Sequence, residues 1–418
     1  MRWGGRRAAA LAFAGAVTAL AVGAGGCRNA GMNEPMDRFA ADLAFLERHS
    51  KIVVLADPQN AARVAVAPAY QGRVMTSTTG GPDAPSFGWI GRAAVESGKR
   101  QPHMSVFGGE DRFWLGPEGG QYALFFKQGD PFDLAHWQTP EPIDWGPWEV
   151  TNQSATEVSF RKHMALVNYS GTRFVLDVDR TVRLVTAADV APRLGTPLGG
   201  AVRTVAFESS NTVTNVGAGK WQPASGLVSV WILGQFIPSP ATTIAIPFAG
   251  SPDETAGPVV NDKYFGAVPP DRLVVRGATV FFKGDGQYRS KIGLSPSRAL
   301  DVAGSYDAAG RVLTLVHYTR PQGASRYVNS MWELQREPYT GDAINSYNDG
   351  PSAPGNPPLG PFYELETSSP GLELAPGERY THVHRTMHLT GPEADLDRIA
   401  RATLEVGLTD ITGAFEPR

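Results

Sequence analysis

Cysteine is almost absent from this chain of 418 residues, because Cys27 is the only one. A disulfide framework within the chain is therefore excluded, and the fold depends on its apolar core. Charge of one sign is also lacking, since 38 basic and 41 acidic residues give a formal net charge of −3. Without a basic patch, nucleic acid is not an expected partner.

The common catalytic signatures are missing as well. The sequence contains no Gly-x-Ser-x-Gly elbow, no His-Glu-x-x-His pair, no Walker lysine loop and no cysteine pair. These absences exclude nucleophile-elbow hydrolases, zincin-type metalloproteases and P-loop enzymes. A repeat of fixed period is absent too, which disfavours a propeller or a solenoid.

Long apolar runs are confined to the N-terminus. Residues 1–7 carry three arginines, residues 8–24 are mostly small and apolar, and Ala24-Gly25-Gly26 precedes Cys27. The run is short for a membrane span, and small residues before a cysteine are typical of a lipoprotein cleavage site. We expect a lipoprotein signal peptide over residues 1–26 and lipidation at Cys27. The rival interpretation is an uncleaved membrane anchor.

Residues 27–34 are expected to be a linker after the lipidated cysteine. Arg28 stands where an aspartate retains many lipoproteins at the inner membrane. By analogy, we expect export to the periplasmic side of the outer membrane, with the lipid on Cys27 as the membrane contact.

The remaining chain, residues 35–418, is predicted to be one domain of many short strands. The chain has 47 glycines and 33 prolines, which fall between short apolar runs and indicate turns. Helical spacing of apolar residues occurs at both ends, in Pro35–His49 and in Pro392–Val406. Strand patterns lie between them, in Tyr122–Phe126, Glu157–Met164, Arg173–Val178, Val202–Glu208, Leu227–Leu233, Arg272–Phe282 and Arg311–Tyr318.

Because strand follows strand without intervening helices, a parallel α/β sheet is disfavoured. The predicted fold class is all-β: one large antiparallel β-sandwich with short peripheral helices at both ends. Two smaller β domains divided near Pro238–Pro270 are the alternative. Residues 300–305 and 311–318 are expected to form a hairpin, with Asp307 bonding the turn backbone and Gly310 at positive φ.

The segment from Phe362 to Leu389, FYELETSSPGLELAPGERYTHVHRTMHL, is the best candidate for chemistry. Strand alternation places Glu364 and Glu366 on one face of the first strand. In the second strand it places His382, His384 and His388 on one face. If the two strands pair, carboxylates and imidazoles converge.

The spelling LET followed by LAPGERY and an alternating strand resembles the C-terminal part of the aldose 1-epimerases, in the galactose mutarotase-like superfamily. Val64–Ser77, VAVAPAYQGRVMTS, is similar to that family's opening strands. GGEDRFWLGPEGG and GDAINSYNDG suggest an uncharacterised bacterial branch, which implies a fold and no particular reaction. The resemblance implies the mutarotase-like sandwich and gives Glu366, in the LET motif, the role of catalytic base.

The chain departs from the family pattern at the catalytic histidine. Its Asn-His-Ser/Thr-Tyr motif is missing, because NTVTN at Asn211–Asn215 is followed by LVSVWILGQF without a histidine. In the family that histidine protonates the ring oxygen. We therefore expect His384 to serve as the general acid, with His103 and His317 as alternatives.

Charged groups beside an aromatic platform are what sugar recognition requires. Gly108–Gly120 holds such a set together with Glu110, and Trp332 offers a second platform. The predicted substrate-binding residues are Asp111, Arg112, Trp114, Glu118, Trp332 and Asn348. An ion-paired loop with tryptophans in the core is the structural alternative.

Two groups invite a metal hypothesis. The three histidines are spaced to reach one ion, and the loop Gly341–Gly350 concentrates Asp342, Asn345, Asn348 and Asp349 as oxygen donors for Ca²⁺ or a sugar. Ordinary turns use the same residues, so the structural interpretation is favoured. No metal site and no cofactor is expected.

Together these features predict an exported, lipid-anchored, carbohydrate-active protein with a mutarotase-like cleft, acting as a sugar epimerase on a free sugar or a glycan end. Two alternatives stay open. One is a glycan-binding lipoprotein without catalysis. The other is a glycoside hydrolase or lyase that pairs Glu366 with Glu118 or Asp111.

Overall fold

The computed structural model describes residues 38–58, 60–251, 257–352 and 355–416. The predicted signal peptide, Cys27 and the linker lie outside these ranges. The residues of these ranges belong to one compact unit. No helix in the described ranges is long and apolar enough to span a membrane.

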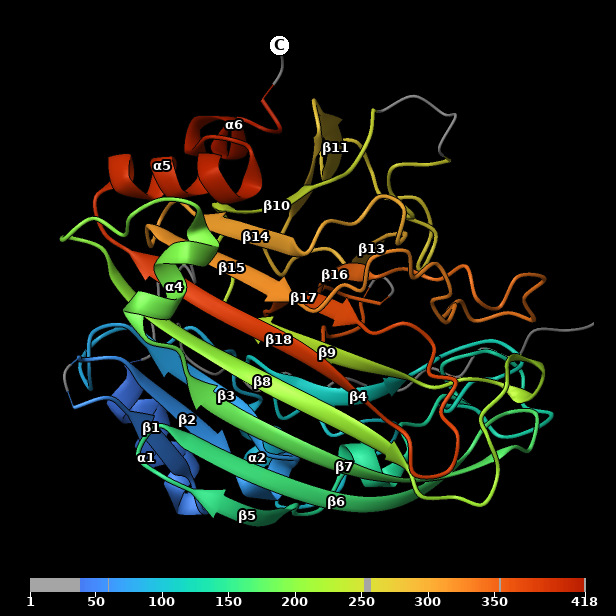
Figure 1. Ribbon diagram of the computed structural model, residues 1–418. Coiled ribbons are helices and arrows are strands. Elements are labelled where there is room, and N and C mark those ends of the chain that lie inside the picture. Colours follow the sequence, from blue (N-terminus) through green and yellow to red (C-terminus); the bar gives the residue numbers. More distant parts are fainter. Residues whose placement is uncertain (1–37, 59, 252–256, 353–354, 417–418) are drawn as a thin grey trace, which may run out of the picture. The chain divides into compact units, whose positions relative to one another are not determined.

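A large antiparallel sheet forms the first layer (Figure 1). Across this ten-stranded sheet the strands are β11 (Leu273–Arg276), β12 (Thr279–Lys283), β10 (Thr242–Pro247), β14 (Val302–Asp307), β15 (Val312–Tyr318), β18 (Arg379–Thr390), β8 (Arg203–Asn215), β7 (Arg173–Leu184), β6 (Glu157–Val167) and β5 (Glu149–Gln153).

A five-stranded antiparallel sheet packs against it. Its strands, in order, are β13 (Ser290–Leu294), β16 (Ile344–Asn348), β17 (Tyr363–Ser368), β9 (Ser229–Phe236) and β4 (Arg112–Gly116). A smaller sheet of β1 (Val53–Ala56), β2 (Arg63–Ala67) and β3 (Arg73–Thr78) lies next to β4, through a bridge between Val74 and Asp111.

Strand alternation decides which side chains fill the space between the two large sheets. Tyr363 and Leu365 of β17 pack in one apolar cluster with Val316 of β15. The Tyr363 hydroxyl lies 2.8 Å from Ser305 Oγ on β14, so a polar contact also joins the layers. The other face of β17, which carries Glu364 and Glu366, is thereby turned away from the ten-stranded sheet.

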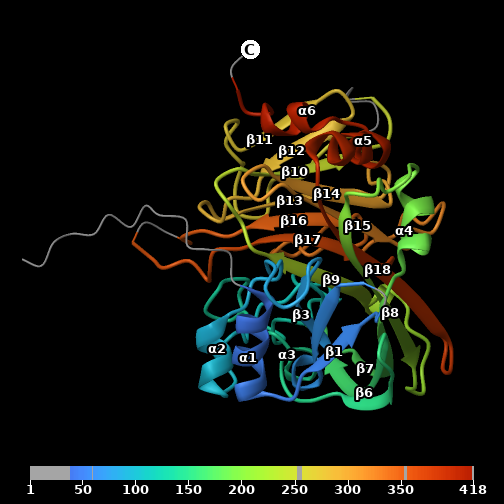
Figure 2. The same ribbon diagram turned by 90° about the vertical axis from the view of Figure 1, so that its left-hand side faces the viewer.

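Helices cover the outer face of the ten-stranded sheet, and two others lie beside the three-stranded sheet (Figure 2). Helices α4 (Ala187–Leu194), α5 (Glu393–Leu404) and α6 (Leu408–Thr412) bury an apolar stripe with Leu313 and Leu389. Helices α1 (Phe39–His49) and α2 (Arg92–Ser97) pack near β3, and α3 (Glu141–Asp144) contacts β4. Short 3₁₀ turns lie at Pro68–Tyr70 and Pro223–Ser225.

The predicted all-β sandwich with helices at both ends is confirmed, and the C-terminal helix follows its predicted stripe. The hairpin of β14 and β15 is also present. Asp307 accepts hydrogen bonds from the backbone N–H groups of Ala309 and Gly310 as expected. Positive φ falls on Arg311 instead of Gly310. Glycine nevertheless suits position 310, because a Cβ there would lie 2.6 Å from Asp307 Oδ2.

Other element predictions are wrong. Tyr122–Phe126 is an irregular segment, because Leu124, Phe125 and Phe126 fill the core from a loop without joining a ladder. The predicted strand Arg272–Phe282 is two strands, β11 and β12, since Gly277 at φ 58° turns the chain between them. The short helices α2, α3, α4 and α6 were not predicted.

Candidate functional site

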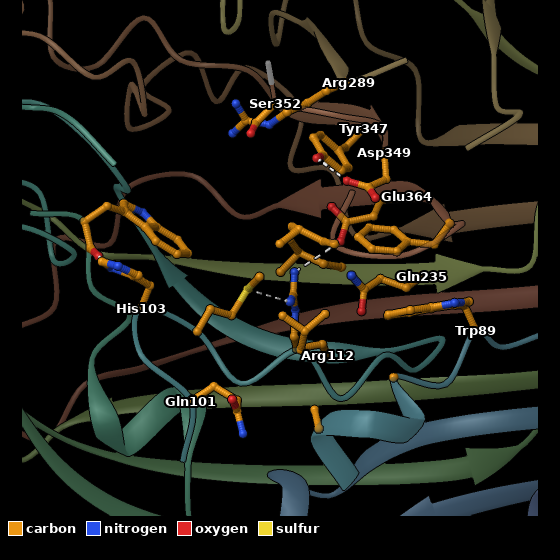
Figure 3. Close-up of a pocket in the computed structure, with 18 of the residues that line it drawn as sticks. Trp89, Gln101, His103, Arg112, Gln235, Arg289, Tyr347, Asp349, Ser352 and Glu364 are labelled. Carbon is orange, nitrogen blue, oxygen red and sulfur yellow. Dashed lines mark hydrogen bonds and ion pairs between the residues drawn. The ribbon is translucent and has the colours of Figure 1, made fainter. Parts of the chain in front are cut away.

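A cavity of about 680 Å³ lies on the face of the five-stranded sheet that is turned away from the ten-stranded sheet. Its floor comes from alternate residues of the strands, among them Arg112 of β4, Gln235 of β9 and Glu364 of β17. Loops supply the walls, and Figure 3 shows His103 and Arg289 on different sides of the cavity.

Aromatic side chains form much of the cavity lining. They are Trp89, Trp114, Trp137, Trp231, Trp332, Tyr264, Phe265, Tyr347 and Phe362. Flat rings of this kind bind the C–H faces of a ligand ring, while the indole N–H groups offer polar contacts. The Nε1 atoms of Trp114 and Trp137 are buried and lack a hydrogen-bond partner in the part of the chain that the structure describes.

Glu364 and Glu366 of β17 share one strand face, as the strand period predicts. Glu366 is 1% exposed and does not line the cavity. Lys291 and Trp231 do line the cavity, and they lie between it and Glu366. Lys291 Nζ donates to Glu366 Oε2 at 2.8 Å, and Trp231 Nε1 donates to the same oxygen at 2.9 Å. Burial lowers the pKa of Lys291, but Glu366 and Glu118 more than offset this, so that pKa is raised.

Glu364 lines the cavity and has different surroundings. Burial, together with the charge of Glu366, raises its pKa to about 8 against the opposing effect of Arg112. A protonated Glu364 interacts by hydrogen bonding with Glu366. Glu364 is therefore largely protonated at pH 7, so it is a carboxylic acid beside Glu366, which pairs with Lys291.

Arg112 holds Glu364 in place. Its Nη2 atom lies 3.2 Å from Glu364 Oε1, and its guanidinium carbon lies 4.0 Å from the centroid of the Trp114 ring. Figure 3 shows this ion pair at the centre of the cavity. The predicted substrate-binding residues Arg112 and Trp114 therefore act as one unit on the cavity floor.

Glu118 and Trp332, which were predicted to bind substrate, also line the cavity. Burial raises the pKa of Glu118, and its carboxyl group hydrogen-bonds to Trp332. Gln235 adds a polar group: its amide is 1% exposed, and neither of its polar atoms has a partner among the described residues. A buried amide without a partner is costly, so it is suited to a polar ligand.

The predicted convergence of carboxylates and histidines is wrong, because β17 and β18 belong to different sheets. His384 is fully buried between the sheets, where its Nδ1 lies 2.9 Å from Thr367 Oγ1. Thr367 is on the opposite face of β17 from Glu366. His384 is therefore not placed to act as the acid, and burial lowers its pKa to about 4.

The other histidines differ in position. His382 contacts Thr367 at 3.0 Å, and His388 contacts Glu110 at 2.9 Å, both within the core. His317 does not line the cavity, whereas His103 does. No group of three or more His, Cys, Asp or Glu side chains that would hold a metal ion exists in the described ranges.

Asp111 and Asn348 need correction as substrate-binding residues. Asp111 points into the core and pairs with Arg180 at 2.6 Å, because it alternates with Arg112. Asn348 accepts from the Gly286 N–H and donates to the Tyr288 carbonyl, so it supports a turn. Just before β16, Asp342 accepts a hydrogen bond from the Tyr264 hydroxyl at 2.7 Å.

Several cavity residues were missed at the sequence level. Lys291, Trp231, Gln235 and Arg289 belong to segments without a recognisable motif. Alternation along Leu227–Leu233 would have put Trp231 and Leu233 on one face, but nothing local shows which face that is. Lys291 reaches Glu366 only because β13 and β17 flank β16.

Several solved structures match this chain at low sequence identity. The Slr1438 protein of Synechocystis sp. PCC 6803 is 13% identical with a TM-score of 0.48, over 82% of this chain and 96% of that chain. A galactose mutarotase-like protein from Lactobacillus casei is 10% identical with a TM-score of 0.45, over 81% and 100%. A galactose mutarotase related enzyme from Lactobacillus acidophilus is 10% identical with a TM-score of 0.44, over 81% and 97%.

No curated protein matches the sequence. Residues 37–415 match the model of a family of unknown function (DUF6786), and the chain belongs to that family.

Proposed function

We propose that the cavity binds a carbohydrate and that the carboxyl pair of Glu364 and Glu366 interconverts the anomers of its reducing end. One observation carries this proposal: two carboxyl groups on one face of β17 sit in opposite environments beside an aromatic cavity. Lys291 compensates the charge of Glu366, while burial raises the pKa of Glu364. Such divergence is typical of acid–base pairs.

In the proposed reaction, the sugar displaces Trp231 or Lys291 from Glu366, and the Glu366 carboxylate then accepts the proton of the anomeric hydroxyl, as the LET resemblance implies. The protonated Glu364 gives its proton to the ring oxygen, and the bond between that oxygen and the anomeric carbon breaks. The open-chain aldehyde rotates, the ring closes on its other face, and both protons return. Arg112 and Gln235 position the ring, and tryptophans stack on it.

Exchange spectroscopy by NMR and polarimetry on reducing sugars test this proposal. The parent protein is expected to accelerate anomer interconversion, and Glu366→Gln to reduce the rate at least about a hundredfold because the base is lost. Arg173→Ala, exposed on β7 outside the cavity, is the matched control. A Glu366→Gln protein as active as the parent would rule out the proposed base.

A second candidate is glycan binding without catalysis. It is favoured by the position of Glu366 behind Lys291 and Trp231, and by the placement of His384 on the far side of the sheet. Calorimetric titration that detects sugar binding by a protein with no effect on anomer exchange would support this candidate. The hydrolase or lyase pairing with Asp111 is not carried further, because Asp111 faces Arg180 in the core.

We also propose that the protein is exported and anchored through a lipid on Cys27, on the periplasmic side of the outer membrane. The arginines of residues 1–7, the apolar run and the small residues before Cys27 support this proposal.

A further inference from the structure

Arg289 is a cavity cation that the proposed reaction does not use. It directly precedes β13 and lies two residues before Lys291, so strand alternation directs both side chains to the cavity. Lys291 is engaged with Glu366 at 2.8 Å. The Arg289 guanidinium, in contrast, has no ion pair or hydrogen bond with any residue that the structure describes.

The position of Arg289 is nevertheless defined. Its guanidinium carbon lies 3.8 Å from the centroid of the Phe265 ring, a cation–π contact that orients the planar fork without using its N–H groups. Figure 3 shows Arg289 beside Ser352 at the edge of the cavity, with no interaction drawn between it and the other residues. Its donors are therefore free for a ligand.

Nearby carboxyl groups do not replace such a ligand. Asp349 accepts hydrogen bonds from the Tyr347 hydroxyl at 2.7 Å and from the Gly360 N–H at 2.9 Å. Burial raises the pKa of Asp349 and that of Glu118 in spite of the nearby Arg289 charge, and neither carboxyl group forms an ion pair with Arg289 among the described residues. An anionic group on the ligand is the remaining counter-charge.

The cavity is also large for one sugar ring. Its volume of about 680 Å³ falls in the range that holds drug-sized ligands, roughly 300–1,000 Å³. Its mouth is apolar, because Phe265 is 40% exposed while Leu359 and Leu134 are each 51% exposed, and all three line the cavity. Further rings of a glycan have surfaces to pack against there.

We propose that the cavity takes an acidic oligosaccharide, and that Arg289 binds the anionic group of a ring near the mouth while the reducing end lies over Glu364. This inference rests on the proposed carbohydrate function. A guanidinium fork matches the two oxygens of a carboxylate, and it also binds sulfate. Arg289 is thus assigned as a specificity-determining residue outside the reacting groups.

The test is a binding screen of the purified protein against oligogalacturonides, oligomannuronates and chondroitin sulfate oligosaccharides, each beside its carboxyl-reduced or desulfated partner. Calorimetry then measures the affinity of each hit. We expect acidic chains to bind at least about tenfold more tightly than their neutral partners, as for loss of one charged hydrogen bond. Hits among uronates or among sulfated chains identify the anionic group.

Arg289→Ala is expected to remove this preference, and Arg289→Lys to restore part of it, because the charge returns without the fork. Arg173→Ala removes an equal charge away from the cavity and controls for long-range electrostatics. Three results would overturn the inference and leave carbohydrate binding intact. The protein could bind only neutral chains, it could bind only monosaccharides, or Arg289→Ala could bind acidic chains as tightly as the parent does. Absence of any glycan binding overturns the proposed function as well.

Discussion

Glu364 and Glu366 show how one strand face holds two carboxyl groups with different chemistry. Lys291 and Trp231 both donate to one oxygen of Glu366, whereas Glu364 faces the cavity and Arg112. The sequence alternation predicts that both lie on one face. The partners, and hence the charge of each group, come from β13, β9 and β4.

The acid role of Glu364 predicts a pH dependence. A general acid works in its protonated form, and the protonated fraction falls as pH rises through the pKa of about 8. The anomer exchange rate is therefore expected to decline above about pH 8, and Glu364→Gln to lower the rate while sugar binding remains. NMR exchange rates between pH 6 and pH 10 check this; a flat profile in that range contradicts it.

Loss of Lys291 should destabilise the protein. Lys291→Met leaves the Glu366 carboxylate buried without its cation, which costs about 3–5 kcal/mol in the free energy of unfolding. The double variant Lys291→Met/Glu366→Gln removes the uncompensated charge and is expected to recover most of that loss. Urea unfolding of the parent, Lys291→Met, Glu366→Gln and the double variant measures this double-mutant cycle. A Lys291→Met protein as stable as the parent would refute the buried ion pair.

At the scale of elements, the three histidines of β18 lie on the face that this strand turns toward β17. His382 and His384 share the Thr367 hydroxyl, and His388 pairs with Glu110 and stacks on Phe87. These contacts join the sheets, so the histidines belong to the packing of the sandwich. Strand period predicts that they share a face, but the layer that this face meets depends on which strands pair.

Buried histidines make the sandwich sensitive to acid. Burial lowers the pKa of His384 to about 4, so below pH 6.5 the unfolded chain takes up a proton that the folded chain does not. Stability therefore falls as pH drops, by about 1.4 kcal/mol per pH unit for each such group. Urea unfolding measures the free energy of unfolding at pH 7 and at pH 5. Its decrease between the two pH values should be about 2 kcal/mol smaller for His384→Gln than for the parent.

The same variant separates packing from catalysis. His384→Gln is expected to bind sugar and exchange anomers at pH 7 as the parent does, because His384 lies on the far side of β17 from the cavity. A folded variant that has lost activity would return His384 to the reaction. Unchanged acid sensitivity would refute the assigned burial.

At the scale of the whole molecule, the described residues begin at Arg38, after the predicted anchor. If Cys27 carries the lipid, Cys27→Ser should move the protein from the membrane fraction to the soluble fraction of the cell envelope. Its thermal unfolding midpoint should match that of the parent, since the anchor precedes the folded unit. A Cys27→Ser protein that stays with the membrane would instead support an uncleaved membrane anchor.

The sequence by itself determined the fold class and one strand face: an all-β chain with helices at both ends, and the placement of Glu364 with Glu366 on one face of β17. These follow from side-chain period and turn chemistry, which are local. Only the tertiary structure decided that the histidines face the core, that Asp111 meets Arg180, and that Lys291 reaches Glu366. Those contacts join residues far apart in sequence, and strand pairing between distant segments brings them together.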